Sequence, residues 1–164
     1  FTVDLSFDMA SKEEVYGSRN AIKTSAIHTI KGKRILIAED NELNAEIAKT
    51  VLEDAGALVT RVEDGQQAVE LFKEKPAGTF DAILMDLMMP VMDGYTATKK
   101  IRSLERLDAK TIPIIAMTAN AFQEDAEKCI AVGMNAHLAK PLDIEKVMIT
   151  ICHLVKKKDS ITIY

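Results

Sequence analysis

The sequence predicts an α/β protein with a parallel sheet, because short apolar runs alternate with stretches that have the periodicity of amphipathic helices. Such apolar runs recur between residues 34 and 139, and after each one the apolar residues return every three or four positions. Parallel strands joined by helices form a sheet that is covered on both faces through right-handed crossovers. We therefore expect a flavodoxin-like three-layer sandwich, with five parallel strands in the order 2-1-3-4-5 and five helices.

The central strand of this sheet is predicted at residues 82–86, where four apolar residues are followed by Asp86. A continuous apolar run of this length is typical of a strand buried on both faces. A loop with Pro90 and Gly94 follows it. The other strands are predicted at residues 34–38, 58–62, 113–117 and 135–139.

The predicted helices follow these strands and begin and end at suitable residues. Leu43, Ile47 and Leu52 lie on one face of the first helix, and Gly56 comes close to the position where glycine ends a helix. Asp64 or a neighbour is expected to cap the second helix. The apolar positions of the later helices are Ala68, Leu71 and Phe72, then Ala97, Ile101 and Leu104, then Phe122, Ala126, Cys129 and Ile130, and finally Ile144, Val147, Ile151 and Val155.

Composition and charge exclude some classes of partner. Of the 164 residues, 48% are hydrophobic and 28% are charged, and the net charge of -4 does not favour nucleic acid or direct membrane contact. No apolar run approaches the roughly 20 residues that span a bilayer, so we expect a cytoplasmic chain, although its parent could be anchored in a membrane. Cys129 and Cys152 fall at apolar helix positions and are expected to be free, buried thiols.

The chain is interpreted as a piece of a longer protein, with one domain preceded by an arm. Apolar and polar residues alternate over residues 1–8, as in a half-buried strand, but no hairpin partner follows. This strand is interpreted as the remnant of a preceding domain, and the mixed, polar residues 9–32 as a linker. We expect the domain itself at residues 33–157 and a tail at residues 158–164.

Polar residues with complementary chemistry follow four of the predicted strands. The carboxyl ends of parallel strands share one edge of the sheet, where ligands bind. Carboxylates gathered there repel one another unless a cation lies among them, and a few hard oxygen ligands suit Mg²⁺. A lysine supplies charge for a phosphate, and an Asp carboxylate can form an acyl phosphate. The residues are Glu39 and Asp40, Asp86, Thr118, and Lys140.

This constellation predicts a phosphoryl-accepting aspartate that is assisted by Mg²⁺. The third strand is central, so its Asp86 would lie between the acidic pair on one side and Thr118 and Lys140 on the other, which selects it as the acceptor. Each residue alone has an ordinary explanation, since residues 39–41 could cap the next helix and Lys140 before a proline could form a rigid turn. Their joint occurrence at four strand ends favours the functional interpretation.

At these residues the chain resembles the receiver domain of two-component response regulators, from about residue 33 to residue 157. The resemblance implies that Asp86 is phosphorylated from a phosphohistidine. It also implies Mg²⁺ ligands at Asp40 and Asp86, the backbone carbonyl of Met88 as a further ligand, and Glu39 reaching the metal directly or through water. The matching segments are residues 35–41, 85–90, 93–94, 116–119 and 139–141.

The same resemblance assigns switch positions. Thr118 matches the switch hydroxyl and Lys140 the phosphate-binding lysine. The second switch position, usually aromatic, is His137 here, which departs from the family's pattern. Phosphorylation is expected to shift a pre-existing equilibrium in the loops after the third and fourth strands and in the surface of the fourth helix, fifth strand and fifth helix.

Details of the sequence resemble receivers that are fused to hybrid histidine kinases. Residues 116–121 and 137–142 have this character, and residues 1–7 are similar to the final strand of a histidine-kinase ATP-binding domain. The resemblance implies that the fragment is a self-phosphorylating acceptor rather than an enzyme, and that its parent is a hybrid histidine kinase. The implied partner is a histidine kinase or a histidine phosphotransfer domain, and a weak homodimer stays open.

Three other functions fit the same fold. A phosphatase with an aspartyl-phosphate intermediate usually has a second Asp two residues after the nucleophile, where this chain has Met88. A flavin carrier needs a phosphate loop rich in Ser, Thr or Gly after the first strand, where Glu39 and Asp40 are acidic. A phosphorylation-independent interaction module predicts loss of the acceptor or of the lysine, and both are present.

Overall fold

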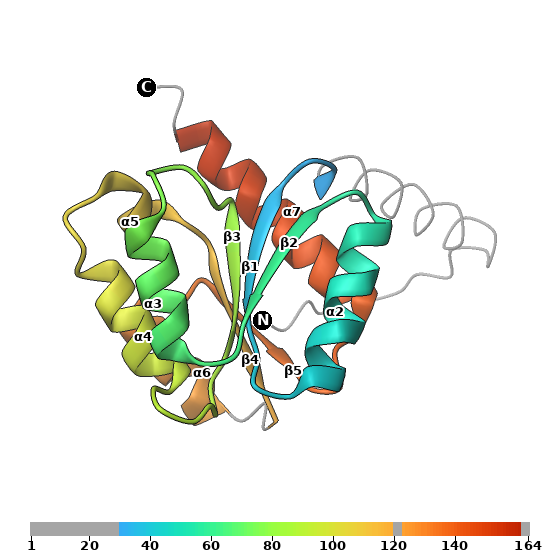
Figure 1. Cartoon of the computed structure of the whole chain (residues 1–164), viewed down its shortest axis with the longest axis horizontal. Helices are drawn as coiled ribbons and strands as arrows, with labels where there is room; N and C mark the ends of the chain where they lie inside the picture. The colour runs from blue at the N-terminus through green and yellow to red at the C-terminus, as the bar shows by residue number, and fades with distance from the viewer. Residues whose placement is uncertain (1–29, 120–122, 162–164) are drawn as a thin grey trace, which may run out of the picture.

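The computed structural model describes residues 30–119 and 123–161 and confirms the predicted α/β fold (Figure 1). No helix in this part of the chain is long and apolar enough to cross a membrane. The strands are β1 (Arg34–Ala38), β2 (Leu58–Val62), β3 (Ala82–Asp86), β4 (Ile114–Thr118) and β5 (Ala136–Ala139). The helices are α2 (Glu42–Asp54), α3 (Gly65–Glu74), α4 (Gly94–Arg102), α5 (Leu107–Thr111), α6 (Gln123–Val132) and α7 (Ile144–Ile161).

The strands form one parallel sheet in the predicted order β2-β1-β3-β4-β5. Helices α2 and α7 cover one face of this sheet, and α3, α4 and α6 cover the other (Figure 1). Two hydrophobic clusters separate the sheet from its two helical layers. The protein is therefore the three-layer sandwich that the alternation of strands and helices predicts.

Strand β3 is buried along its whole length, as predicted for the centre of the sheet. Ile83 and Met85 belong to the cluster under α3, α4 and α6, whereas Ala82 and Leu84 belong to the cluster under α2 and α7. This alternation follows from the period of two residues in a strand. Both faces of β3 are thus committed to the core, and the strand holds its last residue, Asp86, in a fixed position.

The structure differs from the prediction in the connection between α4 and β4. The helix predicted to reach Leu104 ends at Arg102, and the short helix α5 follows it, so the described residues contain six helices instead of five. Arg106 adopts an extended backbone with a φ of −137° between the two helices. Helical periodicity continues across this break, which is why the sequence pattern alone does not reveal it.

The packed part of the chain also extends beyond the predicted domain limits. Ile30, in the predicted linker, is fully buried in the cluster under α2 and α7. Helix α7 continues to Ile161, into the predicted tail. The strand predicted at residues 1–8 lies outside the described residues. Cys129 and Cys152 are buried thiols that form no disulfide, as predicted.

Helix α2 has a narrower buried face than its sequence indicates. Ala48 and Leu52 are buried, but Leu43 and Ile47 keep exposed fractions of 69% and 50%. Successive residues of an α-helix are rotated by roughly 100°, and this rotation places Leu43 and Ile47 beside the buried stripe rather than within it. The prediction that both residues face the core is therefore wrong.

Arg106 and Asp108 join the end of α3 to α5. The Arg106 guanidinium lies over the Phe72 ring, 4.8 Å from its centroid, and Nη1 donates hydrogen bonds to the carbonyl oxygens of Phe72 and Lys75 at 2.8 and 2.9 Å. Nη2 and Nε donate to the two carboxylate oxygens of Asp108 at 2.7 and 3.0 Å. The Gly78 amide donates to the same carboxylate at 3.0 Å. Arginine thus satisfies carbonyls at the end of α3 that the helix itself leaves unpaired.

We expect Asp108→Asn to lower the free energy of unfolding by about 1–3 kcal/mol at neutral pH, because it removes the charge from a hydrogen-bonded, buried carboxylate. Burial by itself raises the pKa of Asp108, but the hydrogen bonds from Arg106 and Gly78 outweigh burial and lower this pKa below its ordinary value of 3.8. The stabilisation is therefore present above the ordinary pKa and is lost as the pH falls through the lower folded-state pKa.

Urea unfolding at several pH values measures this effect, and the difference between wild type and Asp108→Asn should narrow below about pH 4. Asp54→Asn, at the exposed end of α2, is the matched control and should change stability by less than about 0.5 kcal/mol. An equal loss at all pH values would contradict the assignment of this stabilisation to the Asp108 carboxylate.

Candidate functional site

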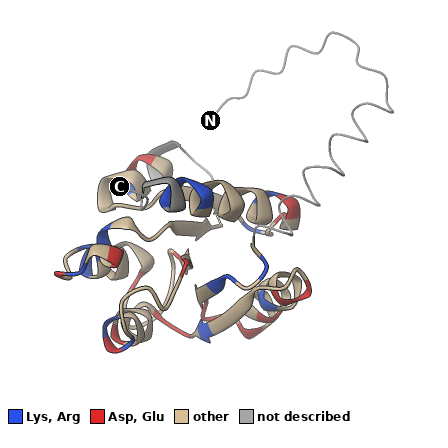
Figure 2. Ribbon diagram, turned by 90° about the horizontal axis from the view of Figure 1, so that it is seen from above, with Lys and Arg blue, Asp and Glu red and all other residues tan. Residues whose placement is uncertain are grey.

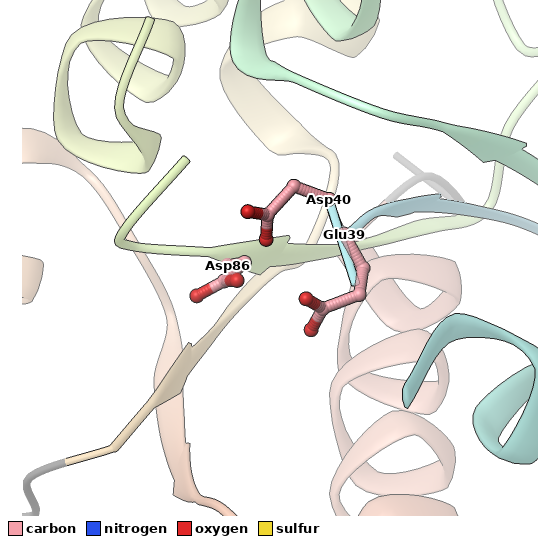
Figure 3. Close-up of side chains that lie close together, drawn as sticks. All are labelled: Glu39, Asp40 and Asp86. Atoms are coloured by element: carbon pink, nitrogen blue, oxygen red, sulfur yellow. The ribbon is translucent and has the colours of Figure 1, made fainter. Parts of the chain in front are cut away.

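The carboxyl edge of the sheet gathers the acidic residues that the sequence predicts there. Glu39 and Asp40 follow β1, and Asp86 is the last residue of β3, the strand paired with β1. One carboxylate oxygen from each of the three residues lies within 4.8 Å of the others (Figure 3). Glu39 and Asp86 are 2% and 4% exposed, although burial of an acidic side chain is unfavourable without a partner.

This acidic cluster lies in a different part of the protein from most of its charged residues. Most of the Lys, Arg, Asp and Glu residues lie on the outer helices and loops, and the strands between them carry mainly other residues (Figure 2). Acidic groups on outer helices remain hydrated, whereas Glu39 and Asp86 have lost most of their contact with water. Their charges must therefore be compensated by neighbouring groups.

Helix capping does not explain the acidic pair. The N-cap of α2 is Asn41, whose side chain accepts a hydrogen bond from the Asn44 amide at 3.0 Å. Glu39 instead accepts a bond from the Asn41 amide at 3.1 Å through Oε1. Within the described residues, the Asp40 carboxylate accepts no hydrogen bond. Capping of α2, which could have explained residues 39–41 together, therefore explains Asn41 alone.

Lys140 provides the positive charge in the cluster. Its Nζ lies 2.6 Å from Oε2 of Glu39 and 2.9 Å from Oδ2 of Asp86. Burial raises the pKa of Glu39, and the hydrogen bond with Lys140 offsets only part of this effect. For Lys140, burial alone would lower the pKa, but the bonds with Glu39 and Asp86 outweigh it and raise the pKa. Lys140 is thus a cation that bridges acids from β1 and β3.

The remaining predicted residues differ in their contacts with this cluster. Thr118 is buried at the end of β4, and its carbonyl oxygen accepts a hydrogen bond from the Lys140 amide at 2.7 Å. The Met88 amide donates to Oδ1 of Asp86 at 3.2 Å, while its side chain is 78% exposed. His137 lies half-buried on β5 beside Ala116. The structure gives it no hydrogen bond to the described residues of the cluster.

Arg61, on β2, is a neighbour of the site that is absent from the predicted residues. Its Nε and Nη2 donate hydrogen bonds to the carbonyl oxygen of Glu39 at 3.3 and 3.2 Å, and Nη2 also reaches the carbonyl oxygen of Asp40 at 3.3 Å. No local motif marks this residue. Only the pairing of Arg61 with Ile37 of β1 brings it to the acidic loop.

The site opens to solvent through a small cleft beside α2. The cleft has a volume of about 110 Å³. Charged residues of the cluster, Glu39 and Lys140, line this cleft together with polar and apolar residues. A small anionic group could therefore reach Lys140 from outside. The lining residues are Glu39, Asn44, Ile47, Lys140, Pro141 and Leu142.

The loop after β3 packs tightly against Asp86. The Gly94 amide donates to the carbonyl oxygen of Leu87 at 3.1 Å, and a Cβ added at Gly94 would overlap the carbonyl oxygen of Asp86. Val91 has a φ of 67°, a conformation that is rare for a β-branched residue. The turn therefore depends on the absence of a side chain at Gly94 to bring α4 close to the end of β3.

Comparison with known proteins identifies the family of this chain. The sequence pattern of the response regulator receiver domain matches residues 35–151. The chain therefore belongs to the receiver domain family, whose members are the phosphoryl-accepting modules of two-component signalling.

Among individual proteins, the chain is 40% identical to histidine kinase 1 of Arabidopsis thaliana, over 78% of this chain and 13% of the kinase. It is 39% identical to hybrid signal transduction histidine kinase B of Dictyostelium discoideum, over 81% of this chain and 7% of that protein. The chain thus spans only a small part of the curated relatives that it matches.

Two solved structures share the fold. The receiver domain of a sensor histidine kinase from Pseudomonas aeruginosa, described with a magnesium ion coordinated in its active site cleft, is 42% identical with a TM-score of 0.69 and covers 76% of this chain and 98% of its own. The second is the receiver domain of a response regulator from Saccharomyces cerevisiae, crystallised with a histidine phosphotransfer protein. It is 30% identical with a TM-score of 0.71, and the match covers 79% of this chain and 92% of that chain.

We expect Gly94→Ala to destabilise the domain by about 1–3 kcal/mol, because the added methyl group forces the Asp86 backbone or α4 to move. Thermal unfolding measures the loss. Gly32→Ala is a useful comparison, since a Cβ there meets no atom within 4 Å and only the left-handed φ of 76° opposes it. Displacement of the Asp86 amide signal in NMR spectra of Gly94→Ala, but not of Gly32→Ala, would confirm the local cause; unchanged spectra would contradict it.

Proposed function

We propose that this receiver domain accepts a phosphoryl group on Asp86 in a reaction that requires Mg²⁺. The observation that carries the proposal is the burial of Asp86 at the end of the central strand, with Glu39 and Asp40 oxygens within 4.8 Å and Lys140 Nζ at 2.9 Å. A carboxylate in this position has charged neighbours for both the metal and the phosphate. Positioning and charge neutralisation are most of what phosphoryl transfer requires from a protein.

Three clustered carboxylates with hard oxygen atoms fit a magnesium ion. Glu39, Asp40 and Asp86 would hold it, and the backbone carbonyl of Met88 is proposed as a further ligand, because the Met88 amide already contacts Asp86. When bound, Mg²⁺ neutralises charge on the acids and on the phosphoryl oxygens. The related receiver domain from Pseudomonas aeruginosa supports this assignment through the magnesium ion in its cleft.

The chain's own residues would perform the remaining functions. An Asp86 oxygen forms the new bond to phosphorus, the bond between phosphorus and the donor's histidine nitrogen breaks, and the nitrogen leaves with the electron pair of that bond. Lys140, already beside the carboxylate, supplies positive charge for the added phosphate. Thr118, at the end of the adjacent strand, is proposed as the switch hydroxyl and His137 as the second switch position.

A phosphatase-like activity is less well supported. The position two residues after Asp86 is Met88, whose apolar side chain is 78% exposed and offers no acid or base. An interaction module that works without phosphorylation is likewise disfavoured, since such a module has no need for a buried Asp86 paired with Lys140.

We expect the purified domain to gain one phosphoryl group when it is incubated with acetyl phosphate and Mg²⁺, as measured by intact-protein mass spectrometry. Asp86→Asn should remain unlabelled, because an amide oxygen is a poor nucleophile toward phosphorus. Asp64→Asn is the matched control: the residue caps α3, and Asn caps a helix as well as Asp does. An unlabelled wild type, or undiminished labelling of Asp86→Asn, would overturn the proposal.

The proposed phosphodonor is a histidine kinase or a histidine phosphotransfer domain, and the parent protein is proposed to be a cytoplasmic or membrane-anchored hybrid histidine kinase. Its histidine-kinase relatives and the yeast complex support this assignment. Residues 1–8 would then be the end of a kinase ATP-binding domain, and the linker to the receiver would end before Ile30, which is packed in the core. The isolated fragment would act as an acceptor, with the kinase activity in the rest of the parent.

The exposed apolar side chains of α2 are proposed to contact that donor. Leu43 and Ile47 lie on the flank of α2, and Ile47 also lines the cleft to Lys140. Exposed apolar residues that border a charged site are typical of an interaction surface. A helical phosphotransfer domain docked there would bring its phosphohistidine to Asp86.

We expect Leu43→Gln to slow phosphoryl transfer from the phosphorylated yeast phosphotransfer protein by about fivefold or more, because it removes an apolar contact from the interface. Labelling by acetyl phosphate, which needs no docking, should not change. Leu58→Gln, an exposed position at the opposite end of the sheet, is the control. Equal effects of Leu43→Gln on both donors would argue against a docking role.

A further inference from the structure

We propose that Arg61 is a positioning residue for the metal site: through the backbone it holds the loop that carries Glu39 and Asp40. This inference rests on the metal site of the proposed function. Arg61 lies in the edge strand β2, in register with Ile37 of β1. Its guanidinium extends along the edge of the sheet to the two peptide groups that follow β1.

The contacts of Arg61 are all with carbonyl oxygens. Nε and Nη2 share the carbonyl oxygen of Glu39, and Nη2 also bonds that of Asp40. Among the described residues, no carboxylate forms an ion pair with Arg61. A planar guanidinium that donates to two consecutive carbonyls restricts both peptide planes, which a single ammonium group does less well.

Asp40 is the metal ligand that most needs this support. The carboxylates of Glu39 and Asp86 are both held by Lys140, but that of Asp40 is exposed and has no hydrogen bond within the described part of the chain. Its place in the cluster depends on the backbone. That backbone is held on one side by Arg61 and on the other by Asn41, which caps α2.

A positioning role and a purely electrostatic role of Arg61 predict opposite effects of its loss on Mg²⁺ binding. A positive charge near a cation site disfavours metal binding, so its removal would strengthen Mg²⁺ binding if charge alone mattered. If Arg61 instead positions the ligands, its loss should weaken binding by about tenfold, as is usual for groups that orient metal ligands. Lysine keeps the charge but lacks the planar fork. It should therefore restore little of the affinity.

The experiment is an NMR titration of wild type, Arg61→Gln and Arg61→Lys with MgCl₂, which follows the backbone amides of residues 39–41 and of Asp86. Arg34→Gln is the matched control, because Arg34 on β1 also donates to a backbone carbonyl, that of Gly78, away from the acidic cluster. Thermal unfolding without metal is recorded for each variant. Both Arg61 variants should bind Mg²⁺ about tenfold more weakly, while Arg34→Gln binds like wild type.

Each other result has a definite meaning. Unchanged or tighter binding by Arg61→Gln, with normal binding by wild type, overturns this inference and leaves the proposed function intact. Equal weakening in Arg34→Gln would assign the effect to general destabilisation and would also overturn it. Absence of Mg²⁺ binding by the wild type would overturn the metal site itself, and this inference with it.

Discussion

The bridge that Lys140 makes between Glu39 and Asp86 is the interaction on which the site depends. Two carboxylates that are almost fully buried would each carry a large desolvation cost, and Lys140 offsets part of it by contacting both, at distances of 2.6 and 2.9 Å. The bridge also joins three strands, because the lysine follows β5 and the acids belong to the ends of β1 and β3. The site thereby stays assembled at the cost of a strong constraint on Lys140, whose amide is further held by Thr118.

The same bridge sets the charge balance of the site. In the described structure the single positive charge of Lys140 compensates part of the negative charge of the acids. A bound metal ion and a phosphoryl group would redistribute this balance, since the metal competes with Lys140 for the carboxylates and the phosphate competes with the carboxylates for Lys140. On the proposed function, Lys140 would thus be the group that senses a phosphate on Asp86, and it directly follows β5.

The surroundings of the site divide into a rigid part and an accessible part. Strand β3 is packed on both faces, and the turn at Gly94 holds α4 against its end, so Asp86 has little freedom. On the other side, α2 buries mainly small residues and leaves Leu43 and Ile47 exposed next to the cleft. The proposed acceptor is thus held rigidly, and the proposed docking residues are accessible, an arrangement that suits transfer from a second protein.

The sequence by itself determined the positions of the strands, the buried central strand and the identity of the charged residues, because period, apolar runs and strand-end residues are local signals. The strand order was predicted from the topology that such alternating units usually adopt. Tertiary structure alone decided three further features: the break at Arg106, where Asp108 and the end of α3 capture the side chain; the exposure of Leu43 and Ile47; and the reach of Arg61 to the acidic loop. Each depends on which elements become neighbours, and residues far apart in the chain carry no local record of that contact.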